Sequence, residues 1–164
     1  MTIIRLALPA FLALTTVSRS LAQTAPRDTG LIIASVAQAV SRAPMEVEDL
    51  SLIVDLSDRK LFVMDGSRVV RQFPVSVGAA DFPTPQGTFH ISRLIWIPSW
   101  TPPPSAWARD HKPEAPGSPG NPMGRVKIFF QEPDYYIHGT LLPSSLGRPA
   151  SHGCVRMRNA DAPV

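Results

Sequence analysis

Residues 50–77 read LSLIVDLSDRKLFVMDGSRVVRQFPVSV, and this stretch decides the fold class. It contains two runs of β-type residues, 50–56 and 60–64, which are separated by turn residues. The Asp65-Gly66 pair that follows predicts a two-residue hairpin loop, because glycine accepts a positive φ. The return strand is predicted over residues 68–77. The domain therefore opens with a β-meander.

Three more short strands are predicted further along the chain, at residues 87–91, 126–131 and 135–138. The 18 prolines disfavour an all-helical bundle, since proline fits poorly inside a helix. The expected fold is mainly β, an antiparallel β-sandwich or barrel-like domain with few short helices.

Residues 96–124 are rich in proline and contain Trp96, Trp100 and Trp107. Repeated prolines predict a long irregular loop, and the tryptophans distinguish this loop from a plain linker. Two interpretations are open. Either the loop covers a binding site, or it is a polyproline-like excursion whose tryptophans only anchor it to the surface.

Length and composition exclude several classes of protein. A chain of 164 residues accommodates one domain of ordinary size. With 44% hydrophobic and 18% charged residues the chain is too apolar for a disordered polymer, and its mean hydropathy of +0.03 does not describe a multi-span membrane protein. The net charge of +3 comes without a Lys/Arg run or interleaved aromatic residues, so nucleic acid is not an expected partner.

Residues 1–22 have the pattern of a secretory signal peptide. Arg5 precedes the uncharged run 6–17, and small residues before Gln23 favour cleavage there. A retained membrane anchor is the alternative, although the run is shorter than the about 20 residues that span a bilayer. Residues 23–49 are then expected to form a tether with one short helix, ahead of a folded domain.

Cys154 is the single cysteine of the chain, so it forms no intrachain disulfide. Either it is buried and inert, or it is kept for its chemistry. A thiol with a reference pKa of about 8.5 becomes an effective nucleophile when a nearby imidazole favours the thiolate, and His138 and His152 are the candidates. Gly153 allows backbone N–H groups to approach a substrate, as an oxyanion hole requires. The competing chemistry is a zinc site, but no further ligand has matching spacing.

Two segments carry a resemblance to a known family: Ile137-His138-Gly139-Thr140, and the run Ser151-His152-Gly153-Cys154-Val155-Arg156-Met157. Asn159 and Asp161 follow behind them. The chain resembles the YkuD family of L,D-transpeptidase catalytic domains over residues 50–164, which are accordingly interpreted as the catalytic domain.

The resemblance implies acyl transfer by a cysteine. Cys154 would be the nucleophile that attacks a peptidoglycan stem peptide, and His138 the general base, with its imidazole oriented by the carbonyl of Gly139. The acyl group would pass to an amine on a second stem peptide or on a protein. The backbone around His152, Gly153 and Cys154 would form the oxyanion hole. The resemblance implies neither a cofactor nor a metal, and it places the protein in the periplasm or cell-wall space of a bacterium.

The resemblance also suggests residues that contact substrate, namely Arg156, Ser151, Thr140 and Trp100. For Arg156 an internal salt bridge is an equal alternative, and a hydrogen-bonded loop role is the alternative for His152. Similar domains continue with a helix and a last strand, so a chain that ends at Val164 is expected either to be a fragment or to lack a closing element. The function is therefore either an L,D-transpeptidase, with a hydrolytic variant as a further option, or an inactive module that binds peptidoglycan.

Overall fold

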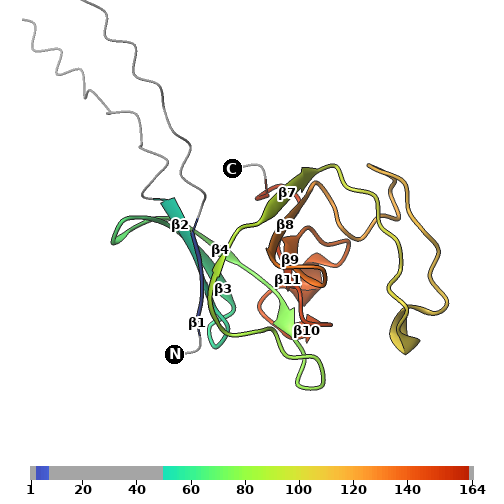
Figure 1. The fold of residues 1–164 in the computed structure, drawn as a ribbon, viewed down its shortest axis with the longest axis horizontal. Helices are drawn as coiled ribbons and strands as arrows, with labels where there is room; N and C mark the ends of the chain where they lie inside the picture. Colours follow the sequence, from blue (N-terminus) through green and yellow to red (C-terminus); the bar gives the residue numbers. More distant parts are fainter. Residues whose placement is uncertain (1–2, 8–49, 163–164) are drawn as a thin grey trace, which may run out of the picture.

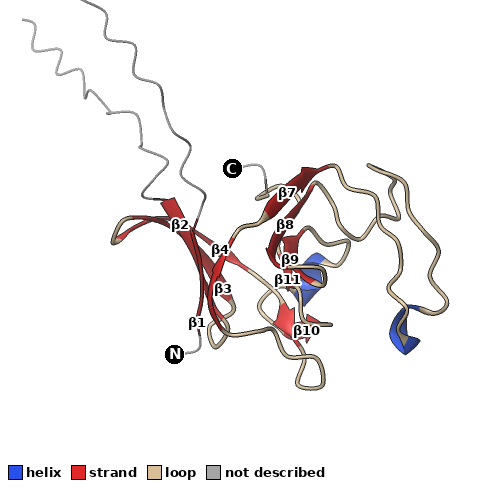
Figure 2. Ribbon diagram, viewed as in Figure 1, coloured by secondary structure: helices blue, strands red, loops and turns tan. Residues whose placement is uncertain are grey.

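The computed structural model describes residues 3–7 and 50–162, and these residues form a mainly β domain, as the sequence predicts. Figures 1 and 2 show two larger sheets that face each other. The first has strand order β4-β3-β2-β1-β6 and the second has order β11-β9-β8-β7, while β10 and β5 form a small third sheet. The strands and 3-10 turns are β1 Ile3–Ala7, β2 Leu50–Asp55, β3 Lys60–Asp65, β4 Arg68–Pro74, β5 Val77–Gly78, β6 Gly87–His90, β7 Arg93–Trp96, η2 Ala106–Ala108, β8 Val126–Gln131, β9 Tyr135–His138, η3 Pro143–Ser145, β10 Pro149–Ser151 and β11 Val155–Arg156.

The predicted meander is present as β2, β3 and β4, which pair antiparallel in sequence order. Gly66 has a φ of +56° in the turn between β3 and β4, where the Asp65-Gly66 signal places it. The predicted return strand is too long, however. β4 ends at Pro74, and Ser76 leaves the first sheet to form a backbone bridge with Arg156. Proline has no N–H to continue a ladder, which explains the break.

The other predicted strands correspond to β6, β8 and β9, but the sequence missed β1, β5, β7, β10 and β11. Most of the missed strands have two to four residues, too few for an alternating pattern to be recognised. Three of the missed pairings are parallel: β1 with β6, β10 with β5, and β11 with β9. Each of the two larger sheets thus contains one parallel pairing and the small third sheet is parallel, while the other strand pairings are antiparallel, as the sequence predicts.

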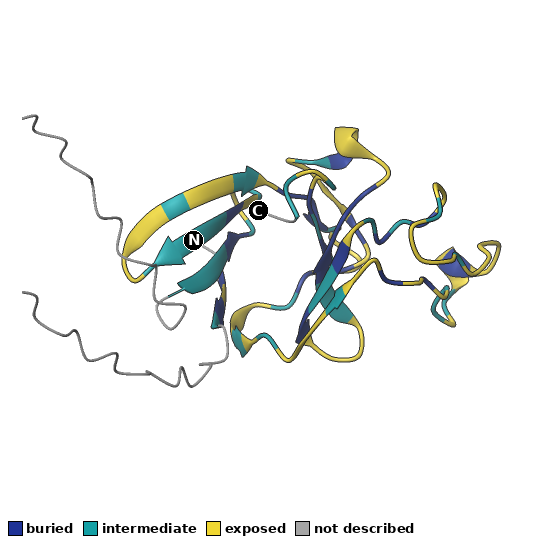
Figure 3. Ribbon diagram, turned by 90° about the horizontal axis from the view of Figure 1, so that it is seen from above, coloured by how far each residue is buried: buried dark blue, intermediate teal, exposed yellow. Residues whose placement is uncertain are grey.

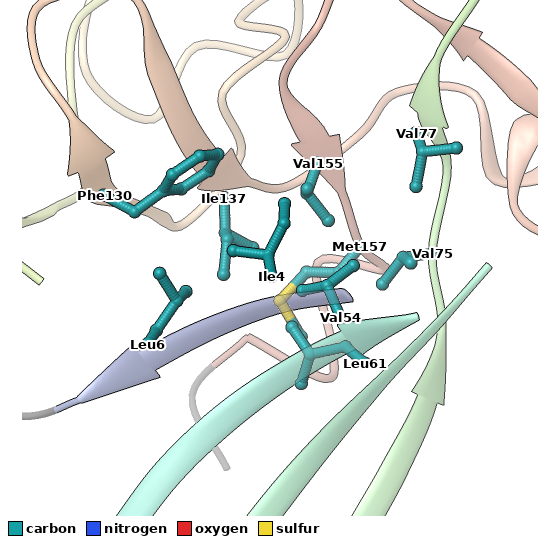
Figure 4. Packing of buried hydrophobic residues seen from close by; sticks show 10 residues of the cluster. All are labelled: Ile4, Leu6, Val54, Leu61, Val75, Val77, Phe130, Ile137, Val155 and Met157. Carbon is teal, nitrogen blue, oxygen red and sulfur yellow. The ribbon is translucent and has the colours of Figure 1, made fainter. Parts of the chain in front are cut away.

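The core lies between the two larger sheets. Figure 3 shows buried stretches of backbone in both layers, and Figure 4 shows buried side chains that converge from both layers. The buried cluster comprises Ile4, Leu6, Val54, Leu61, Val75, Val77, Phe130, Ile137, Val155 and Met157. On β1 and around Leu61 on β3 these residues alternate with exposed or half-buried ones, so these strands present one face to the core, whereas Ile137 and His138 on β9 are both buried, on opposite faces.

Strand β1 comes from the segment that the sequence assigned to a leader. It lies between β2 and β6, antiparallel to the first and parallel to the second. Ile4 and Leu6 are fully buried while Arg5 is exposed, the alternation of a half-buried strand. The predicted tether and its short helix, in residues 23–49, lie outside the described residues. In residues 3–7 and 50–162, no helix is long and apolar enough to span a membrane.

The Pro/Trp-rich loop connects β7 with β8 and extends to the side of the molecule away from the meander (Figure 1). Its start was predicted too early, because Trp96 still belongs to β7. The loop is held together by polar contacts. Trp100 and Glu114 exchange two backbone hydrogen bonds of 3.0 and 2.8 Å, and the buried Asn121 amide donates to the carbonyls of Pro98 and Ala115. The loop is thus ordered against itself and against the sheet.

Candidate active site

Strands β8, β9 and β11 place the candidate catalytic residues on one face of the second sheet. His138 on β9 is paired with Lys127 on β8 and with Arg156 on β11. These three side chains therefore form one row across the sheet, since directly paired residues share a face. A second row, two residues away along each strand, contains Phe129, Tyr136 and Cys154.

The residues between these positions face the other way. Ile128, Ile137 and Val155 pack into the core or against it. This alternation explains how the chain brings His138 and Cys154 to one face although 15 residues separate them in sequence. The face borders a cavity of about 860 Å³, whose far wall comes from the Pro/Trp-rich loop.

His138 is 4% exposed, and its Nδ1 atom lies 3.2 Å from the carbonyl oxygen of Pro122. Burial lowers the pKa of this imidazole to about 3, and the positive charges of Arg156 and Lys127 act in the same direction. Backbone hydrogen bonds to Pro122 and Gly139 oppose the shift in pKa. His138 is therefore neutral near pH 7. When Nδ1 donates its proton to a carbonyl, Nε2 remains as a proton acceptor.

Cys154 is partly exposed, and its thiol donates a hydrogen bond to the carbonyl of Asp134 at 3.2 Å. Burial raises the pKa of the thiol, whereas hydrogen bonds from Tyr136 and the charges of Lys127 and Arg156 lower it. Cys154 and His138 are diagonal neighbours on the same face. In the described part of the chain the thiol proton is directed to Asp134, and no hydrogen bond joins the thiol to the His138 imidazole in this conformation.

The turn before Cys154 is shaped by Ser151 and Gly153. The Ser151 hydroxyl donates to the carbonyl of Cys154 at 2.5 Å and accepts the N–H of Gly153 at 3.2 Å. Gly153 has a φ of +105°, and a Cβ atom there would lie 2.8 Å from the Tyr135 ring. Ser151 is 1% exposed and does not line the cavity, so the structure does not bring it to the cavity wall with the other predicted substrate contacts. Its role is to hold the turn.

His152 forms part of the cavity wall. Its ring stacks on Trp107, with ring centres 4.0 Å apart and an angle of 3° between the planes, and Phe82 contacts it edge-on. Desolvation lowers the pKa of His152, and the charge of Arg156 adds to this effect. The His152 side chain therefore joins the Pro/Trp-rich loop to the nucleophile turn.

Three of the predicted substrate contacts do line the cavity: Arg156, Thr140 and Trp100. Arg156 donates to the carbonyl of Ala150 at 3.2 Å and forms no ion pair within the described part of the chain, so the internal salt bridge is not observed. The Thr140 hydroxyl accepts a hydrogen bond from the backbone N–H of Leu142, and the backbone N–H of Thr140 donates to the side-chain oxygen of Asn159. Of the other tryptophans, Trp107 lines the cavity, but Trp96 is 56% exposed and lies outside it.

The sequence interpretation missed Lys127, the carbonyl of Pro122 and the Tyr136 side chain as parts of the site. Lys127 carries a usable signal, since a charged residue between Val126 and Ile128 marks the solvent-facing positions of an otherwise apolar strand. The carbonyl of Pro122 has no such signal, because its approach to His138 depends on the path of the loop. Within residues 3–7 and 50–162, no three His, Cys, Asp or Glu side chains gather as a metal site would require.

A thiol and a buried neutral imidazole on one sheet face, beside a walled cavity, define a candidate site for covalent catalysis by cysteine. The match with known proteins is more specific. Residues 49–163 match the family model described as the YkuD L,D-transpeptidase catalytic domain. The chain belongs to this family.

Two curated relatives show the extent of the similarity. A Fuscovulum blasticum protein named as an L,D-transpeptidase in the ATP synthase subunits region is 44% identical over 91 residues, 54% of this chain and 48% of that protein. YkuD of Bacillus licheniformis, also named as an L,D-transpeptidase, is 32% identical over 110 residues, 67% of this chain and 54% of that protein. The chain spans about half the length of these relatives.

Solved structures support the fold. L,D-transpeptidase 3 from Mycobacterium tuberculosis superimposes with a TM-score of 0.53 at 16% identity, over 66% of this chain and 52% of that one. A second L,D-transpeptidase, solved in complex with imipenem, gives a TM-score of 0.52 at 17% identity, over 70% of this chain and 60% of that one. These chains share the mainly β architecture described above.

Proposed function

We propose that this domain is a cysteine-dependent L,D-transpeptidase that acts on peptidoglycan stem peptides. The observation that carries the proposal is the placement of Cys154 on the same cavity face as the neutral His138, in a chain of the YkuD family. Two of the curated relatives carry names that describe L,D-transpeptidases. The reaction needs no cofactor, because a thiol and an imidazole suffice for acyl transfer.

In the proposed mechanism the Cys154 thiol first turns from the Asp134 carbonyl towards His138. Nε2 of His138 takes the thiol proton, and the thiolate attacks the carbonyl carbon of the third stem residue. Backbone N–H groups of the turn 152–154 stabilise the resulting oxyanion. The tetrahedral intermediate collapses to a thioester when the C–N bond breaks and His138 returns the proton to the D-alanine amine that leaves.

In the second half of the reaction an amine of another stem peptide, or of a protein, attacks the thioester. His138 takes the amine proton, the new amide forms, and the thiolate is released and reprotonated. Water in place of the amine would make the same site a carboxypeptidase. Catalytic hydrogen bonds are often long before substrate binds, which is compatible with the present orientation of the sulfur.

A second candidate function is favoured by that same orientation. Since the Cys154 thiol donates to a backbone carbonyl, the domain would serve as a non-catalytic module that holds stem peptides in the cavity. In that case the thiol would contribute to packing only.

We also propose that the protein works outside the cytoplasm, in the periplasm or cell-wall space. The support is the sequence of residues 1–22, with cleavage expected before Gln23. Cleavage there would remove strand β1 from the first sheet. The N-terminal residue of the folded protein, determined by sequencing after secretion, distinguishes a processed chain from a retained β1.

Intact-mass analysis after incubation with a carbapenem, beside a Cys154→Ala control, tests the catalytic proposal. We expect a covalent adduct on the native chain and none on the control. Release of D-alanine from a stem tetrapeptide should show the same dependence on Cys154. A folded native chain that forms no adduct and releases no D-alanine supports the binding module instead.

A further inference from the structure

Two positive charges flank the candidate base, one on each neighbouring strand. Lys127 and Arg156 are the direct cross-strand partners of His138, from β8 and β11 respectively. Two strand spacings separate their backbones by about 10 Å, and their long side chains share the face that borders the cavity. The two cations therefore flank His138, and Cys154 lies on the Arg156 side, two residues before it.

Neither cation has an acidic partner within residues 3–7 and 50–162. Both are half-buried, and desolvation is the largest cause that lowers the pKa of each. Holding unpaired charges away from water costs free energy, so such groups are characteristic of sites that bind an opposite charge.

The acidic residues on the cavity wall do not neutralise this pair. Glu114 is hydrogen-bonded to the Ser118 hydroxyl at 2.6 Å, on the loop side of the cavity. Asp134 is exposed and raises the pKa of Tyr136, but it is not among the groups that shift the pKa of either cation. The group that raises the pKa of both cations is Cys154, the candidate nucleophile.

The contacts of Lys127 and Arg156 leave N–H donors of both side chains free to bind a ligand. Nζ of Lys127 lies 4.1 Å from the centre of the Tyr136 ring, and cation–π contact fixes its position without using its N–H groups. One guanidinium nitrogen of Arg156 donates a hydrogen bond to the carbonyl of Ala150. Its remaining N–H groups match the geometry of a carboxylate.

We propose that Lys127 and Arg156 form a subsite that binds a free carboxylate of the donor peptide beside Cys154. This inference rests on the proposed function, and it names the chemical feature by which the site selects its donor. A stem peptide has two such carboxylates near the reacting bond: that of the terminal residue that leaves, and that on the side chain of the third residue. Neither cation touches the reacting atoms, so both act in substrate binding.

The first test compares how quickly iodoacetate and iodoacetamide alkylate Cys154. Both reagents report on the same thiolate and release iodide, so the ratio of their rates isolates the attraction for a carboxylate. We expect Lys127→Met to lower the iodoacetate-to-iodoacetamide ratio about fivefold, in line with the effect of local charge on association. Lys127→Arg should retain the ratio. Lys60→Met, which removes an exposed charge on β3, is the matched control.

The second test measures binding and needs no reactive thiol. In the Cys154→Ala background, calorimetry compares a stem tetrapeptide with two analogues, one amidated at its terminal carboxylate and one at the side-chain carboxylate. One amide should bind about tenfold more weakly, which identifies the carboxylate, and Lys127→Met should abolish that difference. Equal affinity of all three peptides would overturn the subsite. So would an alkylation ratio that falls as much in Lys60→Met as in Lys127→Met. A missing carbapenem adduct with an intact binding difference overturns only the catalysis.

Discussion

Burial keeps the imidazole of His138 neutral, and the stability of the domain therefore depends on pH. The pKa of the imidazole falls from its ordinary value of 6.5 to about 3 in the fold. Between these values the unfolded chain binds a proton that the folded chain does not. The free energy of unfolding is therefore unaffected by this group above pH 6.5 and falls as the pH decreases towards about 3.

The first prediction concerns this residue. Between pH 6.5 and 4.5 the native protein should lose about 2 kcal/mol more stability than His138→Gln, because the unfolded imidazole goes from half to almost fully protonated while the folded one stays neutral. Urea unfolding at both pH values measures the difference, and the carboxylates common to both proteins cancel. An identical loss in the two proteins would show that the imidazole is solvated in the fold.

Ser151 illustrates how a residue of the family motif acts without touching substrate. Its hydroxyl connects the Gly153 N–H to the Cys154 carbonyl. Removing the hydroxyl leaves a buried amide without its partner, which costs about 1–3 kcal/mol. The turn would then hold the nucleophile less firmly.

The second prediction follows from that contact. Ser151→Ala should lower the rate of carbapenem acylation about tenfold, since small errors in the position of a nucleophile are costly. The matched control is Ser145→Ala, which removes a hydroxyl hydrogen bond to the Leu142 carbonyl in η3. Mass spectrometry over time gives both rates. Equal rates in the two variants would mean that the Ser151 contact does not position the thiol.

At the scale of elements, β1 is the strand whose sequence has two interpretations. As a strand it completes the first sheet between β2 and β6, with Ile4 and Leu6 in the core (Figure 4). As part of a leader it would be removed. A single segment cannot pack in the sheet and be cleaved away at once, so the stability of the full chain shows whether the strand is in use.

The third prediction is that Leu6→Asp destabilises the full-length chain by more than about 3 kcal/mol, because it places an unpaired charge among buried side chains. Arg5→Gln, on the exposed side of the same strand, should change stability by less than about 0.5 kcal/mol. Chemical unfolding of purified full-length protein compares them. If Leu6→Asp is as stable as Arg5→Gln, β1 does not contribute to the folded domain.

The Pro/Trp-rich loop and the nucleophile turn are the elements that close the cavity. They meet where Trp107 stacks on His152. Composition alone predicted a special loop with tryptophans, and Trp100 and Trp107 do line the cavity. Which tryptophans reach it depends on where β7 ends, and the sequence analysis did not predict β7 and began the loop at Trp96.

At the scale of the whole molecule, two sheets share one core. Leu61 on β3 and Ile137 on β9 belong to different sheets and to the same buried cluster. Because the sheets bury their apolar faces against each other, neither is expected to persist without its partner.

The fourth prediction is that Leu61→Ala and Ile137→Ala each cost about 2–5 kcal/mol, as large-to-small substitutions in a core do. Each variant should unfold in a single transition by both fluorescence and circular dichroism. Val69→Ala, at a 51% exposed position on β4, should stay within about 0.5 kcal/mol of the native chain. Two separate transitions would show that the sheets are independent units.

The sequence by itself determined the meander, the β8 and β9 strands, the candidate nucleophile and base, and the family. These features depend on local information: alternating apolar residues, a strong turn pair, and chemically specific residue types in a short motif. The roles of Cys154 and His138 remain proposals, but their selection needed no tertiary structure.

Only the tertiary structure decided which residues surround that pair. Lys127 reaches the site because β8 and β9 pair in a register that sets it opposite His138, and Arg156 does so through the parallel pairing of β11. The Pro122 carbonyl and strand β1 likewise find their partners across long stretches of chain. Strand register between distant segments follows from how side chains pack across the whole core, and no local stretch of sequence contains that information.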